Sequence, residues 1–185
     1  MAKVSIIGTG TWGIALGMVL AQNGHEVTAW SALPKEIEAL RESYTCKNLP
    51  GVEIPRSIVF TADLQEACTD KEMLVLSVPS VFTRGVAKQM NPFVKEGQLI
   101  VSVVKGIEEK TLMTMSQQIE EELPMANVAV LSGPSHAEEV SRGIPTTVVA
   151  GAKDRQTAEH IQNLFMSSVF RVYTSPDILG IELGG

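Results

Sequence analysis

The chain has few cysteines. There are 2 among its 185 residues, Cys46 and Cys68, and they form neither a C-x-x-C motif nor a metal-ligand spacing. This scarcity argues against a disulfide framework and against a cysteine metal site. We expect both thiols to be reduced packing residues of a cytoplasmic protein, and we expect no bound metal.

Positive charge and long apolar runs are also scarce. The 15 lysines and arginines are outnumbered by 21 aspartates and glutamates, which gives a net charge of −6, whereas binding to a nucleic-acid backbone needs a basic face. No apolar run reaches the ~18 residues of a membrane span, and no secretory leader precedes the first strand. We therefore expect neither a nucleic-acid partner nor a membrane partner.

The chain does have 44% hydrophobic residues, and they form alternating strand and helix patterns that fit one domain, residues 1–185. Strands are expected at 3–7, 26–30, 57–61, 73–78, 98–104, 127–131, 146–150 and 169–174, and helices at 11–23, 35–43, 63–68, 80–90, 111–122, 135–141 and 154–166. Apolar strands separated by helices belong to a mostly parallel sheet that is covered on both faces. The expected fold class is α/β, a Rossmann-type doubly wound sheet.

The first strand leads into the pattern G-x-G-x-x-G, formed by Gly8, Gly10 and Gly13. In a dinucleotide-binding turn the first glycine takes a backbone conformation that side chains forbid. The second lets the pyrophosphate approach the main chain, and the third lets the helix pack on the strand. The helix start adds N–H donors and partial positive charge. Because the motif lies between a strand and a helix, we predict that it binds NAD or NADP; a purely structural turn is the alternative.

Ligands of such sheets lie outside the carboxyl ends of the strands, so the other loops at that edge are also informative. The loop after the second strand reads Ser31-Ala32-Leu33, with neither the acid that commonly binds the ribose of NAD nor an arginine for a 2′-phosphate. Lys35 is interpreted as a solvated helix residue. We therefore expect the affinities for NADH and NADPH to lie within about tenfold, ~1.4 kcal/mol.

Two more strand ends carry candidate residues. Pro79 ends the strand before it and leaves Ser80 placed to cap the next helix, and the same loop equally suits a position beside the nicotinamide. Lys105 follows an apolar strand and precedes Gly106. From the residues alone it is an exposed loop lysine, and the alternative is a cation that attracts an anionic substrate.

The segment S-G-P-S-H-A-E-E at 132–139 reads as a strand end, a turn and a helix start. Ser135 and Glu138 have the spacing of a capping box, which predicts a helix beginning there. Gly133 brings the backbone close to the same crevice. His136 has no identifiable carboxylate partner, so we expect a surface or packing histidine.

Together these motifs resemble bacterial NAD(P)-dependent glycerol-3-phosphate dehydrogenase. The tryptophan inside the glycine motif and the segment at 132–139 are the most specific parts of the likeness, which spans the whole chain. The matching segments are G-T-G-T-W-G at 8–13, N-G-H-E-V at 23–27, V-P-S at 78–80, K-G at 105–106, S-G-P-S-H-A-E-E at 132–139, P-T-T at 145–147 and F-R-V-Y at 170–173.

The resemblance implies an activity and assigns residues to it. The family transfers a hydride reversibly between NAD(P)H and dihydroxyacetone phosphate, giving sn-glycerol 3-phosphate for glycerophospholipid synthesis. By position, Lys105, Gly133 and Ser135 would contact the substrate, which favours the functional interpretation of Lys105. The expected cofactor-binding residues are Gly8, Gly10, Thr11, Trp12, Gly13, Ser31, Pro79, Lys105 and Ala137.

The chain departs from the family in two places. The family's basic pair after the second strand is Ala32-Leu33 here, so a preference for NADP does not carry over. The family continues past Gly184-Gly185 with A-L-K-N, whose lysine donates the proton, and with a helical domain that holds the substrate phosphate. The resemblance thus implies a cofactor domain without the catalytic lysine, part of an enzyme that we expect to be a homodimer. A non-catalytic dinucleotide-binding module and a related two-domain dehydrogenase of a hydroxy acid or sugar are the alternatives.

Overall fold

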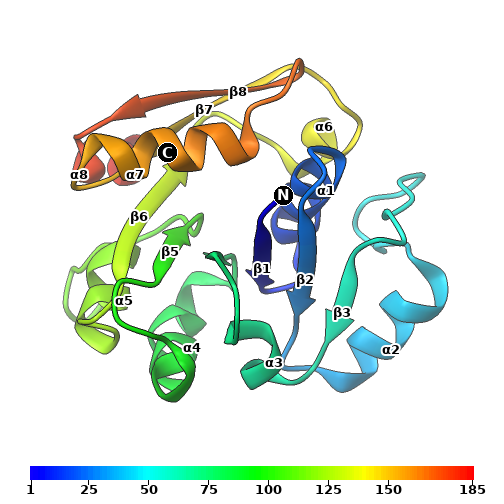
Figure 1. The fold of residues 1–185 in the computed structure, drawn as a ribbon, viewed down its shortest axis with the longest axis horizontal. Helices are drawn as coiled ribbons and strands as arrows, with labels where there is room; N and C mark the ends of the chain where they lie inside the picture. The colour runs from blue at the N-terminus through cyan, green and yellow to red at the C-terminus, as the bar shows by residue number, and fades with distance from the viewer.

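The computed structural model describes residues 1–185, which form a single eight-stranded sheet flanked by helices (Figure 1). The strands are β1 (Lys3–Ile7), β2 (Glu26–Trp30), β3 (Val59–Thr61), β4 (Met73–Leu76), β5 (Leu99–Ser102), β6 (Asn127–Ser132), β7 (Thr146–Gly151) and β8 (Phe170–Ser175). The α-helices are α1 (Thr11–Gln22), α2 (Pro34–Ser43), α3 (Leu64–Cys68), α4 (Thr83–Met90), α5 (Met115–Glu122), α6 (Ala137–Ser141), α7 (Arg155–Phe165) and α8 (Ile178–Gly184), with 3-10 turns at Ser80–Phe82 and Asn91–Phe93.

The sheet order is β3-β2-β1-β4-β5-β6-β7-β8, which confirms the doubly wound α/β class. The strands β1 to β6 are parallel, and Ile7 is in register with Trp30 of β2 on one side and with Leu76 of β4 on the other. The chain therefore winds outward from β1 in both directions. This reversal of strand order opens a crevice beyond the carboxyl ends of β1 and β4, where ligands of such sheets bind.

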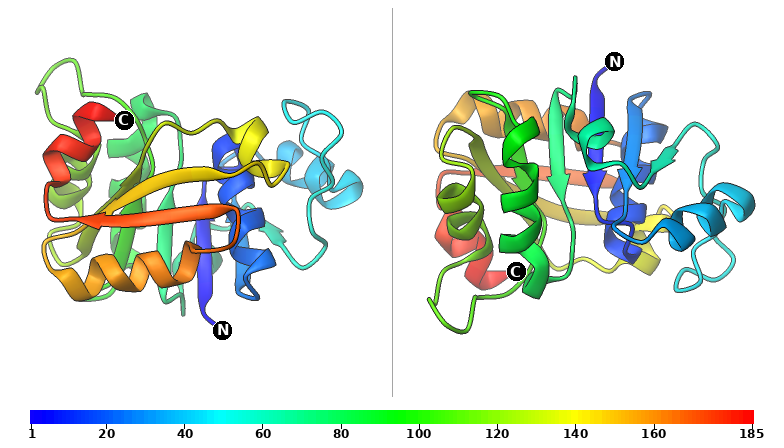
Figure 2. Two further views of the ribbon diagram at one scale, coloured as in Figure 1. Left: turned by 90° about the horizontal axis from the view of Figure 1, so that it is seen from above. Right: turned by 90° about the horizontal axis from the view of Figure 1, so that it is seen from below.

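The last two strands run against the others. β7 pairs antiparallel with β6, and β8 pairs parallel with β7. The helix in the connection from β6 to β7 is the five-residue α6, which is about 7.5 Å long. The six-residue strand β6 is about 20 Å long, so α6 is too short to return the chain to the edge at which β6 began. The chain enters β7 from the edge at which β6 ended, and Figure 2 shows α7 lying alongside β7 and β8.

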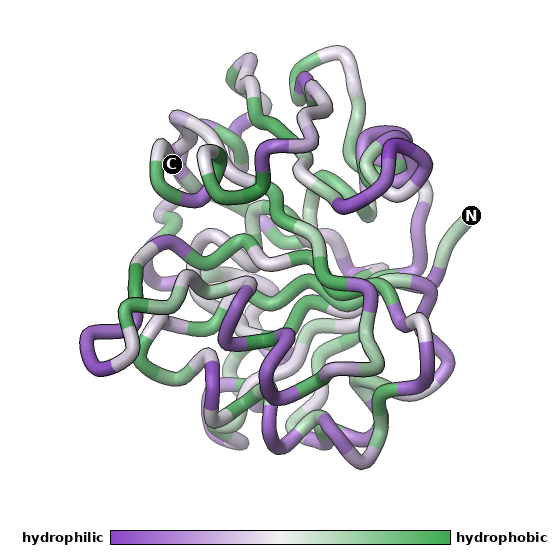
Figure 3. The backbone as a smooth tube through the Cα atoms, turned by 90° about the vertical axis from the view of Figure 1, so that its left-hand side faces the viewer, coloured by the Kyte–Doolittle hydropathy of each residue, from purple (hydrophilic) through white to green (hydrophobic).

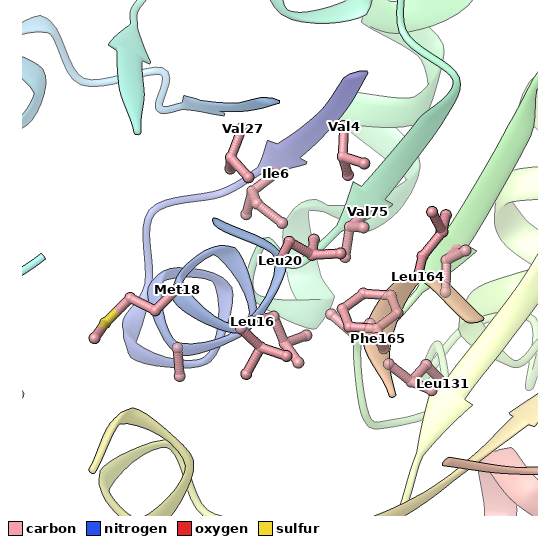
Figure 4. Packing of buried hydrophobic residues seen from close by; sticks show 14 of the residues in the cluster. Val4, Ile6, Leu16, Met18, Leu20, Val27, Val75, Leu131, Leu164 and Phe165 are labelled. Carbon is pink, nitrogen blue, oxygen red and sulfur yellow. The ribbon is translucent and has the colours of Figure 1, made fainter. Parts of the chain in front are cut away.

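Alternating side chains of the strands supply a core on each face of the sheet. Ile6 belongs to a cluster of 36 buried residues that includes Leu16 of α1 and Phe165 of α7, whereas Ile7 belongs to a second cluster of 15 that includes Leu76. The face covered by α1, α6 and α7 therefore holds most of the core. Figure 4 shows the side chains of α1 and α7 meeting there, and Figure 3 shows hydrophobic segments crossing the middle of the molecule. None of the helices is both long and apolar enough to cross a membrane.

Two expectations for the helices were wrong, and one helix was not expected. The expected helix at 80–90 opens with a 3-10 turn in which Pro79 holds the N-cap position without a side-chain hydrogen bond, so Ser80 is not its cap. The predicted capping box is absent, because α6 begins at Ala137, after His136. The pattern also missed α8, whose two glycines weaken the helical pattern. Asp177 caps that helix, and it packs on β6 and β7.

Both cysteines are free thiols, as expected. Cys46 is half-buried in the loop after α2, and Cys68 is buried at the end of α3. Burial disfavours the thiolate and raises the pKa of Cys68 to about 12, although the nearby Lys71 acts in the opposite direction. Cys68 is therefore an unreactive packing residue.

Candidate functional site

The glycine turn between β1 and α1 has two glycines that the surrounding protein requires. Gly8 has a φ of 120°, and a Cβ there would lie 2.8 Å from the carbonyl carbon of Ser77 and the nitrogen of Val78. A Cβ on Gly13 would collide with the carbonyl oxygen of Gly8. These two glycines let β1, α1 and the end of β4 meet at one point, as the motif predicts.

Gly10 is different, because nothing in the protein requires it to be glycine. Its φ and ψ are −61° and 168°, which any residue can adopt, and a Cβ there would meet nothing within 4 Å. Gly10 is also the N-cap of α1, where no side chain accepts a hydrogen bond from the first turn. The N–H groups that begin this 12-residue helix therefore face open space beside a residue without a side chain, an arrangement that fits a bound anion.

Beyond this turn lies a hollow of about 480 Å³, which we call the crevice pocket. It unites residues from the ends of β1, β4, β5 and β6 that are far apart in the sequence. Its lining residues are Gly10, Thr11, Trp12, Ser77, Val78, Pro79, Ser80, Val103, Val104, Lys105, Ser135, His136, Ala137 and Glu138. Seven of the expected site residues thus line one cavity, and Gly8 and Gly13 lie buried in the turn beside it.

Three expected substrate residues meet at one carbonyl group. The Nζ of Lys105 donates to the backbone oxygen of Gly133 at 3.1 Å, and the Oγ of Ser135 donates to the same oxygen at 3.2 Å. Gly133 itself is fixed by packing, since a Cβ would lie 2.9 Å from the carbonyl oxygen of Thr147 in β7. The Lys105 ammonium keeps two further protons for a ligand, and the Ser135 oxygen keeps its acceptor capacity.

The loop that carries Lys105 is tied to α4 and α5 through Arg84. The Arg84 guanidinium donates to both carboxylate oxygens of Glu108, at 2.9 and 2.8 Å, and also contacts Glu121 and Glu122. These hydrogen bonds lower the pKa of Glu108 to about 2 and raise that of Arg84. Glu108 is therefore ionised at neutral pH, and it fastens the segment just after Lys105.

Ser77 is a residue whose role the sequence did not reveal. Its Oγ donates to the carbonyl oxygen of Gly8 at 2.8 Å and lies within 3.3 Å of that of Ile7. Ser77 thus clamps the end of β4 to the glycine turn and lines the crevice pocket. A serine after an apolar strand gives no indication of such a partner, because the contact spans about 70 positions in sequence.

Ser31 lies away from the crevice pocket, buried at the end of β2. Its Oγ donates to the Oε2 of Glu36 at 2.5 Å, and the Trp30 carbonyl just before it accepts from the amide of Gly8 at 2.9 Å. The end of β2 therefore adjoins the glycine turn. Residues 31–33 contain no acid, but α2 returns the carboxylate of Glu36 to this strand end.

The remaining expectations concern Ser135 and His136. Ser135 does not cap α6; its hydroxyl bonds to Gly133 instead. His136 is exposed at the N-cap position of α6, without a side-chain hydrogen bond to the helix, and it lines the crevice pocket.

Comparison with known proteins agrees with this geometry. Residues 3–158 match the family described as NAD-dependent glycerol-3-phosphate dehydrogenase N-terminus. The chain belongs to this family. It is 61% identical over 186 residues to a glycerol-3-phosphate dehydrogenase [NAD(P)+] of Agathobacter rectalis, covering 100% of this chain and 55% of the relative. A relative of the same name from Fusobacterium nucleatum is 51% identical over 188 residues, with 100% and 56% covered.

Solved structures give the same result. The crystal structure of a glycerol-3-phosphate dehydrogenase from Coxiella burnetii superposes with a TM-score of 0.93 at 28% identity, covering 100% of this chain and 57% of that one. The yeast enzyme superposes with a TM-score of 0.86 at 25% identity, covering 98% and 58%. The chain thus spans little more than half the length of the relatives that it matches.

Proposed function

We propose that the chain binds NAD(H) or NADP(H) with the pyrophosphate against the turn from Gly8 to Gly13. The observation that carries this proposal is the open space at Gly10, next to the uncapped start of α1. Backbone N–H donors at a helix start hold an anion without a basic side chain, which suits an acidic chain. The adenosine half would then lie toward Ser31 at the end of β2.

The nicotinamide half would extend into the crevice pocket. Thr11, Trp12, Pro79 and Ala137 line that pocket together with Lys105, and Ala137 is buried within its wall. When bound, the cofactor supplies or accepts a hydride at the C4 position of its nicotinamide ring. The protein's part is to hold a carbonyl substrate beside that position and to limit its movement.

Dihydroxyacetone phosphate is the substrate that this arrangement suits. Its anionic charge would be attracted by Lys105. The Lys105 ammonium would also stabilise the negative charge that develops on the reacting carbonyl oxygen during reduction to sn-glycerol 3-phosphate. Ser135 would bond to a substrate hydroxyl group, with Gly133 fixing the positions of both side chains. The substrate class rests on the family to which the chain belongs.

The family resemblance implies that the proton donor and the phosphate-binding residues would lie in the part of the relatives that this chain does not cover. Loss of a general acid removes about 10²–10⁴ in rate, and loss of the phosphate contacts removes most substrate binding. We therefore propose that residues 1–185 bind the cofactor and that the complete two-domain protein catalyses the reaction.

The experiment compares the 185-residue chain with the full-length protein. Calorimetry should show NADH binding to both, whereas oxidation of NADH by dihydroxyacetone phosphate, followed at 340 nm, should occur with the full-length protein alone. Robust turnover by the short chain would refute the assignment of the proton donor to the region of the relatives that this chain does not cover. Binding without turnover in the full-length protein would instead favour a non-catalytic dinucleotide-binding module.

A further inference from the structure

A second hollow of about 330 Å³ lies between the glycine turn, α2 and the loop after α2, and it adjoins the crevice pocket. We call it the β2 pocket because Glu36 in its wall bonds to Ser31 at the end of β2. The two share Gly10 and Thr11, so both hollows border the glycine turn. The residues that line the β2 pocket are Thr9, Gly10, Thr11, Glu36, Ala39, Leu40, Ser43, Thr45, Cys46, Lys47 and Asn48. Glu36 and Lys47 are the charged members of this set.

The carboxylate of Glu36 is held in place at this pocket. Its Oε2 accepts from the Oγ of Ser31 at 2.5 Å, and that Oγ in turn accepts from the amide of Leu33 at 3.2 Å. Ser31 is 7% exposed, so the hydroxyl that holds the Glu36 carboxylate is itself buried. A carboxylate has about four acceptor positions, and Ser31 occupies one of them, which leaves the others for a ligand.

Thr9 is a second polar residue that lines the same pocket. Its side chain is buried at 4% exposure, and its Oγ1 has no hydrogen-bond partner within the protein. A buried hydroxyl without a partner is unfavourable, and such groups usually bond to water or to a ligand. The β2 pocket therefore combines an unsatisfied hydroxyl, a fixed carboxylate and a position beside the glycine turn.

We propose that Glu36, positioned by Ser31, binds the adenosine ribose hydroxyls and makes the chain select NAD(H) against NADP(H). This inference rests on the proposed cofactor binding. A carboxylate accepts hydrogen bonds from ribose hydroxyls but repels a 2′-phosphate. Glu36 is 28 positions after Gly8 and stands on a helix, so it lies outside the loop where such an acid is normally sought. Lys47 is exposed on a loop and acts in the opposite sense, so the test includes it.

The test is a set of calorimetric titrations of the 185-residue chain with NADH and NADPH at one ionic strength. We expect the wild type to bind NADH at least about thirtyfold more tightly, ~2 kcal/mol at 1.4 kcal/mol per tenfold. This value replaces the difference of about tenfold or less that residues 31–33 alone led us to expect, because those residues do not include Glu36. Glu36→Gln should bring the ratio within about threefold, mainly by strengthening NADPH binding, and Ser31→Ala should give an intermediate ratio. Glu38→Gln is the matched control, because Glu38 lies exposed on the same helix and outside the pocket.

Each outcome bears on a distinct claim. A wild type that binds both cofactors equally, or one whose preference for NADPH disappears in Lys47→Ala, overturns the assignment to Glu36. The same is true if Glu36→Gln leaves the ratio unchanged while circular dichroism shows a folded protein, or if Glu38→Gln alters it as much. Failure of the wild type to bind either cofactor overturns the proposed function itself.

Discussion

Replacing Gly10 with valine should abolish cofactor binding and leave the fold intact. The backbone at Gly10 is ordinary, and no protein atom lies within 4 Å of the position of a Cβ. The substitution therefore creates no internal clash. Its cost to folding is that of an unfavourable N-cap residue, about 1 kcal/mol or less.

The cost to binding is larger because the valine side chain would fill the space in which the pyrophosphate approaches α1. A hydrogen bond to a charged group contributes roughly 1.5–3 kcal/mol. If two such bonds from the start of α1 are lost, binding weakens by about 3–6 kcal/mol, which corresponds to roughly 10²–10⁴ in Kd.

Calorimetric titration with NADH, together with a thermal melt of each protein, separates these two effects. Gly85→Val is a matched control, since Gly85 also faces open space but lies on α4 and lines neither pocket. We expect the control to bind NADH as the wild type does. An unchanged Kd in a folded Gly10→Val protein would refute the placement of the pyrophosphate at this turn.

Three further predictions follow from other parts of the structure. In the full-length protein, Lys105→Ala should lower kcat/KM by a factor of roughly 10² or more while NADH affinity stays nearly constant. Steady-state kinetics close to wild type would refute a role of Lys105 in substrate binding. At pH 8 a thiol reagent should modify Cys46 and spare Cys68, because burial raises the pKa of Cys68 to about 12. Bound NADH should slow the modification of Cys46, which lines the β2 pocket. Equal modification rates for the two thiols in the folded chain would contradict the first expectation. Because Arg84 lowers the pKa of Glu108 from 4.5 to about 2, their interaction stabilises the fold above pH 4.5 and is lost as pH falls toward 2. Glu108→Gln should therefore lower Tm at neutral pH and reduce the fall in Tm over that range, whereas parallel Tm curves for the two proteins would count against it.

The order of elements along the chain is a property of the sequence, because it depends on local patterns. β2 has the bounds that the sequence pattern predicts, Glu26 to Trp30. The glycine motif likewise identifies the turn that needs Gly8 and Gly13. Apolar strands alternating with helices are sufficient to predict a parallel sheet with two covered faces. The motif residues also located most of the crevice pocket, since parallel strands end at a common edge.

Contacts between distant segments were decided by the tertiary structure alone. The hydrogen bond of Lys105 to the carbonyl oxygen of Gly133 and the hydrogen bond of Ser77 to that of Gly8 join segments whose spacing carries no information about their meeting. Glu36 is only five positions from Ser31, but it is the direction of the turn into α2 that returns its carboxylate to the end of β2. Local patterns specify which segments become strands and helices, whereas the packing of those segments decides which side chains meet in a pocket.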